Sequence, residues 1–78
     1  MKRIEILGSG CYTCHLLEQA AREAVALAGV EAEVVMVTDY GRILAHGVMH
    51  TPGLVIDGRV VSAGRIPTPA AIAAWLTA

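Results

Sequence analysis

Hydrophobic and polar positions follow two different periods along the first half of the chain. Residues 3–7 form a short, largely apolar run in which Arg3 and Glu5 are the charged positions, which is typical of a strand covered on both faces. Over residues 11–28 the apolar positions instead recur at helical spacing and share one face: Cys14, Leu17, Ala21, Ala24, Val25 and Ala28. Gly29 follows, at the position where glycine commonly ends a helix. The pattern predicts a strand followed by a long amphipathic helix.

The middle of the chain is expected to hold a second strand and a short helix. Residues 31–37 are too few and too rich in β-branched side chains for a helix, so we predict a strand there. Thr38 or Asp39 is suited to cap a helix over residues 40–46, which Gly47 would end.

The last third of the chain carries the clearest local signal, a β-hairpin. Residues 54–56 and 59–61 are apolar or β-branched and flank Asp57-Gly58, which supplies the positive φ angles of a two-residue turn. Thr68-Pro69 is typical of a helix start, so a final helix is expected over residues 70–76. The order is therefore strand, helix, strand, helix, hairpin, helix. The first two strands should be parallel through a right-handed crossover, and the hairpin should add antiparallel strands.

Composition and charge limit the classes of function. A chain of 78 residues is expected to form a single domain, residues 1–78. Six basic residues against seven acidic ones leave no basic stripe for nucleic acid and no polybasic segment for membrane lipids. No apolar run approaches the roughly 18 residues of a membrane span, and residues 1–7 resemble a strand more than a signal peptide. We therefore expect a cytoplasmic protein, in which a cysteine pair is more often catalytic, redox-sensing or metal-binding than structural.

The two cysteines lie at the predicted start of the first helix, in the sequence Cys11-Tyr12-Thr13-Cys14. A thiol at a helix N-terminus is favoured as thiolate by exposed amides and the helix dipole, so the pKa of Cys11 should lie below that of free cysteine. Cys11 would attack a partner disulfide, and Cys14, one turn further, would resolve the mixed disulfide. This spacing predicts thiol–disulfide exchange on protein or small-molecule disulfides, without a bound cofactor.

A strand, a Cys-x-x-Cys sequence opening a helix, and Thr51-Pro52 before a hairpin resemble the thioredoxin and glutaredoxin superfamily. The chain is most similar to its small single-domain members, often described as redox-active disulfide proteins, and the similarity extends over residues 4–76. The resemblance implies a thioredoxin-like α/β fold, β-α-β-α-β-β-α, with a four-stranded mixed sheet and helices on both faces. It also implies a cis peptide bond before Pro52, beside the cysteines. The backbone of Thr51 would pair there with an extended substrate segment.

The residues around the cysteines depart from the larger relatives. Tyr12-Thr13, which we expect to contact the substrate, replaces the Gly-Pro of thioredoxin and the Pro-Tyr of glutaredoxin, and this leaves the reduction potential open. Gly10 stands where thioredoxin has a tryptophan, so the surface offered to thioredoxin's partners is altered. The electron donor is therefore left as an unidentified reductase or thiol.

Other ionisable residues near the motif have two readings each. Glu5 precedes Cys11 by six residues, where thioredoxin has a buried acid; pointing inward, it would accept the proton of Cys14, and otherwise it is a solvated glutamate. His15 would stabilise the Cys11 thiolate as an imidazolium, or lie in solvent. His46 and His50 are expected at the surface.

Three other classes of function remain to be weighed. Residues 11–15 match the Cys-x-x-Cys-His sequence that attaches c-type haem, but the half-β pattern and the expected cytoplasmic location contradict that reading. Cys11 and Cys14 suit transient transport of a thiophilic metal ion, whereas a permanent structural metal would need further ligands, for which the sequence offers only His15 or His50. A non-catalytic interaction module would require both cysteines to be inert.

Overall fold

The helices and strands follow one another in the predicted order in the computed structural model, which describes residues 1–8 and 12–78. Within those residues the elements are β1 (Lys2–Leu7), α1 (Tyr12–Ala28), β2 (Ala32–Val37), α2 (Tyr40–Ala45), β3 (Gly53–Ile56), β4 (Arg59–Ala63) and α3 (Pro69–Thr77). Each begins within one or two residues of its expected position.

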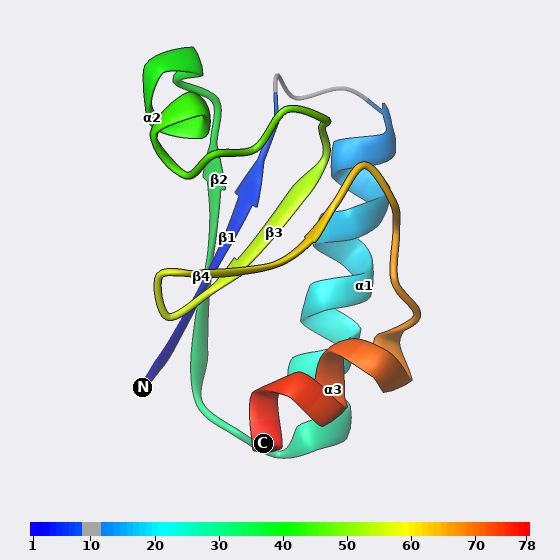
Figure 1. Cartoon of the computed structure of the whole chain (residues 1–78). Coiled ribbons are helices and arrows are strands. Elements are labelled where there is room, and N and C mark those ends of the chain that lie inside the picture. The colour runs from blue at the N-terminus through cyan, green and yellow to red at the C-terminus, as the bar shows by residue number, and fades with distance from the viewer. Residues whose placement is uncertain (9–11) are drawn as a thin grey trace.

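The sheet is mixed, as expected, and its strand order is β2-β1-β3-β4 (Figure 1). β1 and β2 are parallel, with Ile4 opposite Val34. On its other side β1 pairs antiparallel with β3, where Ile6 lies opposite Leu54. The two central strands are therefore β1 and β3, and β1 leads directly to the cysteine sequence.

The hairpin between β3 and β4 forms at the predicted turn. Asp57 has a φ of 50° and Gly58 a φ of 82°, the left-handed values that a two-residue turn between twisted strands requires. The pairing of β3 with β4 shifts register between Leu54 and Val55, which marks an irregularity in the ladder.

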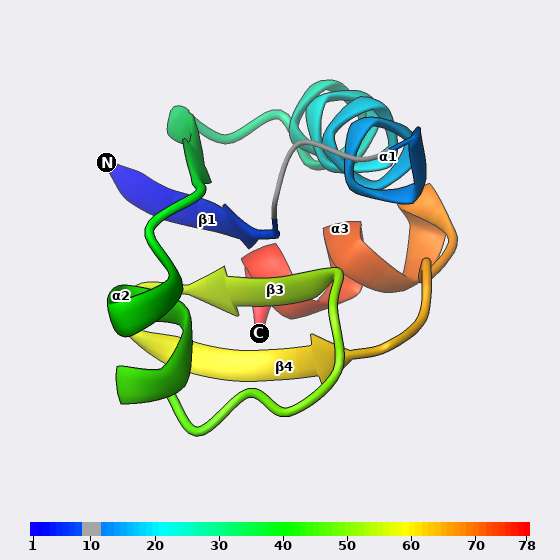
Figure 2. The ribbon, with the colours of Figure 1, turned by 90° about the horizontal axis from the view of Figure 1, so that it is seen from above.

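Helices cover both faces of the sheet, as the resemblance implied. Ile4 and Ile6 of β1 pack into one cluster with buried side chains of α1 and α3, including Leu17, Ile72 and Leu76. The opposite face carries a smaller cluster, in which Ile43 of α2 packs with Leu7, Val37, Val48 and Val55. Viewed from above, α1 and α3 lie on one side of the sheet and α2 on the other (Figure 2).

The helix ends follow their sequence signals with one exception. Gly29 has a φ of 66° just after α1, and Thr68 caps α3 by accepting a hydrogen bond of 3.2 Å from the Ala71 amide. Asp39 occupies the N-cap position of α2, but within the described residues its side chain makes no capping hydrogen bond. Among the helices that the structure describes, none has the length and apolar character that crossing a bilayer demands.

Candidate functional site

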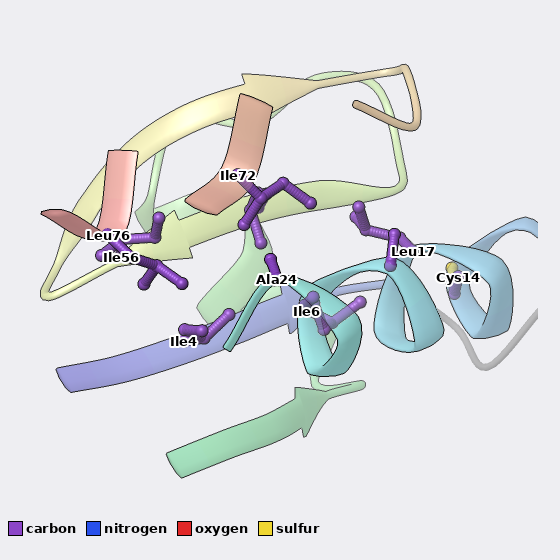
Figure 3. Close-up of a cluster of buried hydrophobic side chains, with 11 residues drawn as sticks. Ile4, Ile6, Cys14, Leu17, Ala24, Ile56, Ile72 and Leu76 are labelled. Atoms are coloured by element: carbon purple, nitrogen blue, oxygen red, sulfur yellow. The ribbon is translucent and has the colours of Figure 1, made fainter. Parts of the chain in front are cut away.

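Cys14 lies in the first turn of α1, with its side chain directed into the core. The residue is 0% exposed and belongs to the cluster between the sheet and the helices α1 and α3. Figure 3 shows it beside Leu17 at the beginning of the helix, at the edge of this cluster. Cys11, the predicted nucleophile, lies outside the described residues. Tyr12 and Thr13, which separate the two cysteines, are exposed, Tyr12 to 76%.

Gly8 brings the end of β1 against the buried sulfur. Its amide donates a hydrogen bond of 3.0 Å to the carbonyl of Val37, which extends the β1–β2 ladder by one residue. A Cβ placed on Gly8 would overlap Sγ of Cys14 and lie 3.9 Å from Cβ of Thr51. The end of β1, the first turn of α1 and the segment before β3 therefore meet at one point.

The peptide bond between Thr51 and Pro52 is cis, as the resemblance implied. Pro52 is buried and Thr51 is exposed. The carbonyl of Pro52 accepts a hydrogen bond of 2.9 Å from the amide of Gly64, which has a left-handed φ of 75°. The segment after β4 thus holds the segment before β3, at the end of the sheet where β1 ends and α1 begins (Figure 1).

Comparison with known proteins shows which family has this sequence and arrangement. A model described as a thioredoxin domain matches residues 2–77. The chain belongs to the thioredoxin family. It is 41% identical over 66 residues to a thioredoxin of Methanothermobacter thermautotrophicus, which covers 85% of this chain and 86% of that protein. It is also 40% identical over 65 residues to a thioredoxin of Methanocaldococcus jannaschii, covering 83% of this chain and 74% of the relative.

Membership of the thioredoxin family confirms the general reading of the sequence. The chain is a thioredoxin-like redox protein, of a family of thiol–disulfide oxidoreductases. Tyr12 and Thr13 are exposed and Cys14 is buried, so the boundary between surface and core falls between Thr13 and Cys14. A buried sulfur is shielded from outside reagents.

Glu5 and Cys14 lie on opposite faces of the sheet. It is opposite Val35 and Val55, which belong with the α2 side of the sheet, and its carboxylate lies 3.7 Å from the His46 imidazole. Cys14 packs on the other face, with Ile4 and Ile6. Successive residues of a strand point to opposite faces, so the sheet separates Glu5 from the sulfur. The solvated reading of Glu5 is therefore wrong, because the side chain is buried, at 7% exposure. The burial that the inward reading expected is found on the α2 side of the sheet, and not on the side that α1 covers.

The histidines have different surroundings. His15 is exposed, as the solvated reading had it, with Nδ1 3.5 Å from Oε1 of Glu18. His46 is half-buried against Glu5, a contact that no motif indicates. His50 is exposed, next to Thr51.

The described residues contain no preformed site for a metal ion. There, no group of three or more histidine, cysteine or acidic side chains is gathered to hold an ion. A closed structural zinc site needs four such ligands.

Proposed function

We propose that this protein is a thiol–disulfide oxidoreductase in which Cys11 is the nucleophile and Cys14 the resolving residue. The observation that carries the proposal is the position of Cys14 in the first turn of α1, buried against Gly8, which in turn lies close to Thr51. Membership of the thioredoxin family and the spacing of the two cysteines support the same chemistry.

In the first step, the Cys11 thiolate attacks one sulfur of a substrate disulfide. A bond forms between Cys11 and that sulfur while the substrate S–S bond breaks, and the departing thiolate takes up a proton. The start of α1 favours this step, because the helix dipole and the first backbone amides stabilise negative charge there.

In the second step, Cys14 loses its proton and attacks the sulfur of Cys11. The Cys11–Cys14 disulfide forms, the bond to the substrate breaks, and the second substrate thiolate leaves and is protonated. The substrate has then gained two electrons and two protons, and the protein has lost them. Since Glu5 lies across the sheet, the proton of Cys14 passes to the departing thiolate, directly or through water.

Substrate docking is assigned to the exposed residues around the cysteines. Tyr12 and Thr13 present their side chains at the start of α1, and Thr51 lies exposed in front of the buried Pro52. We propose that the backbone of Thr51 pairs with an extended segment of the substrate, which is a form of strand addition.

The oxidised protein must be returned to the dithiol by a second partner. We propose a reductase or a thiol donor for this step and a cytoplasmic setting, where small thiols keep such pairs reduced. Neither the oxidation of the pair nor its reduction requires a bound cofactor or metal in this chain, because the two sulfurs themselves give up and take up the two electrons.

Trapping of the mixed disulfide tests the assignment of the two sulfurs. The Cys14→Ser variant, incubated with a disulfide-bonded peptide, should accumulate a covalent adduct through Cys11, visible by intact-mass measurement and reversed by dithiothreitol. The Cys11→Ser variant, as the matched control, should form far less because Cys14 is buried. Equal adducts in both variants would contradict the roles, and no adduct in either would refute the exchange reaction and leave the metal carrier as the reading to test.

A further inference from the structure

Gly8 makes an unusually close approach to the side chain of Cys14. A Cβ on Gly8 would lie 3.4 Å from Cβ of Cys14 and would overlap its Sγ, closer than real Cβ atoms come to other atoms. The backbone of Gly8 has little freedom to move away, because its amide is bound to the carbonyl of Val37 at the end of the sheet.

The conformation of the chain does not explain a glycine here. Gly29, Gly47, Gly58 and Gly64 all have left-handed φ angles, which favour glycine, whereas Gly8 does not. What residue 8 requires is the absence of a side chain. The space that a Cβ would fill is occupied by sulfur.

A side chain at residue 8 and the observed position of Sγ exclude each other. Side-chain torsions occupy discrete staggered positions, so Sγ can give way only by moving to a different one. Any side chain at residue 8 must therefore rotate Sγ away from β1 or shift α1 relative to the sheet.

We propose that Gly8 is a positioning residue for the resolving sulfur, whose missing side chain lets Sγ of Cys14 pack against the end of β1 in the orientation from which it attacks Cys11. The kinetic part of this inference rests on the proposed function, and the packing part does not. In this inference Gly8 affects the reaction through the position of Cys14.

A double-mutant cycle on stability tests the packing. Gly8→Ala should lower the Tm by roughly 5 to 15 °C, because overpacking is costly in so small a domain. In a Cys14→Ala background the same substitution should lower the Tm far less, since the overlapping sulfur is gone. Gly41→Ala serves as a control. Among the described residues a Cβ there meets only Oδ2 of Asp39, at 3.8 Å, and alanine is favoured in a helix, so the Tm should hold or rise.

Each outcome of the double-mutant cycle either supports the packing inference or overturns it. Equal losses of Tm in both backgrounds would overturn the inference, because the side chain at residue 8 would then be colliding with something other than sulfur. If Gly8→Ala fails to fold alone, recovery of folding in the double variant supports the inference. Failure of the double variant, while Cys14→Ala folds, overturns it.

A kinetic readout shows whether the packing serves the reaction. With a chromophoric aromatic thiol loaded on Cys11 as a mixed disulfide, release of the thiol by Cys14 should be about 10- to 100-fold slower in Gly8→Ala, because misplacement by about 1 Å can cost that much. Alkylation of Cys11 by iodoacetamide in the same variant should be unchanged, which a general loss of structure would not allow. Release at the wild-type rate would overturn the positioning role. An absence of release in the wild-type protein would instead refute the proposed function and leave the stability cycle to decide the packing.

Discussion

Oε2 of Glu5 lies 3.7 Å from Nε2 of His46, on the face of the sheet opposite Cys14. Oε1 of the same carboxylate lies 3.6 Å from Nε of Arg3. Oε2 is buried and finds no hydrogen-bond partner among the described residues. The carboxyl group thus lies near Arg3 and His46, at distances longer than a hydrogen bond. It brings the middle of β1 close to the end of α2.

Replacing Glu5 by glutamine should leave the chemistry of the cysteines intact. The sheet separates Glu5 from Cys14, so the carboxylate has no direct path to the proton of the thiol. The rate of mixed-disulfide resolution in Glu5→Gln should equal that of the wild-type protein. Loss of a general base typically costs 100-fold or more, and a drop of that size would return Glu5 to the reaction.

Replacing Glu5 by leucine should leave the protein at least as stable. Val35 and Val55 flank residue 5 on the neighbouring strands, so leucine would enter an apolar surrounding. A buried carboxylate oxygen without a hydrogen bond carries a desolvation cost that leucine avoids. The Arg3 side chain that loses its partner is 47% exposed, so water can solvate its charge. Urea unfolding of Glu5→Leu and wild type measures the difference. A loss of more than about 1 kcal/mol would mean that the contacts with Arg3 and His46 outweigh the desolvation of the carboxylate.

The hairpin turn carries a pH-dependent contribution to stability. The Arg3 amide donates a hydrogen bond of 2.8 Å to Oδ1 of Asp57, and this bond, with the charge of Lys2, lowers the pKa of Asp57 from its ordinary value of 3.8. A lowered folded-state pKa gives stability that is present above pH 3.8 and is lost as the pH falls through the folded-state value.

Asp57→Asn should therefore have a lower Tm than the wild-type protein at pH 7, and the difference should shrink as the pH falls below 3.8. Asparagine tolerates the left-handed φ of 50° and retains an oxygen for the Arg3 amide, so the substitution removes mainly charge. Thermal unfolding of both proteins across this range is the measurement. A difference in Tm that stays constant with pH would show that the charge of Asp57 makes no contribution.

Removing the cap of α3 should destabilise the domain. Oγ1 of Thr68 accepts a hydrogen bond from the Ala71 amide, and Thr68→Ala leaves that amide without its capping partner. We expect a loss of about 1 kcal/mol in the free energy of unfolding. Thr68→Ser, which keeps the hydroxyl, is the matched control and should stay close to wild type. Equal losses in both variants would point to the methyl group instead of the hydrogen bond.

Most of the fold was predictable because its signals are local. Asp57-Gly58, Gly29 and Thr68-Pro69 each act through backbone conformation or hydrogen bonds within a few residues, and each defines the end of an element as expected. The parallel pairing of β1 and β2 followed from the helix between them.

The side of the sheet on which Glu5 is buried could not be predicted from the strand that contains it. β1 is buried on both faces, so apolar residues occupy both, and the run Ile4 to Leu7 does not reveal which face α1 covers. The contact of His46 with Glu5 joins residues far apart in the chain, and the packing of Gly8 on Cys14 depends on how the end of β1 meets the first turn of α1. Neither leaves a periodic signal in the sequence.

The central claim is that Cys11 and Cys14 form and break a disulfide with each other, and equilibration with defined ratios of reduced and oxidised glutathione tests it most directly. Intact-mass measurement after acid quenching should show a form lighter by two hydrogens, whose fraction follows a two-electron titration and which is missing from Cys11→Ser and Cys14→Ser. The same titration gives the reduction potential of the cysteine pair. A potential near −270 mV, about that of thioredoxin, would identify a reductant, and one near about −120 mV would identify an oxidant. A wild-type protein that never loses two hydrogens, at any ratio, would contradict the account.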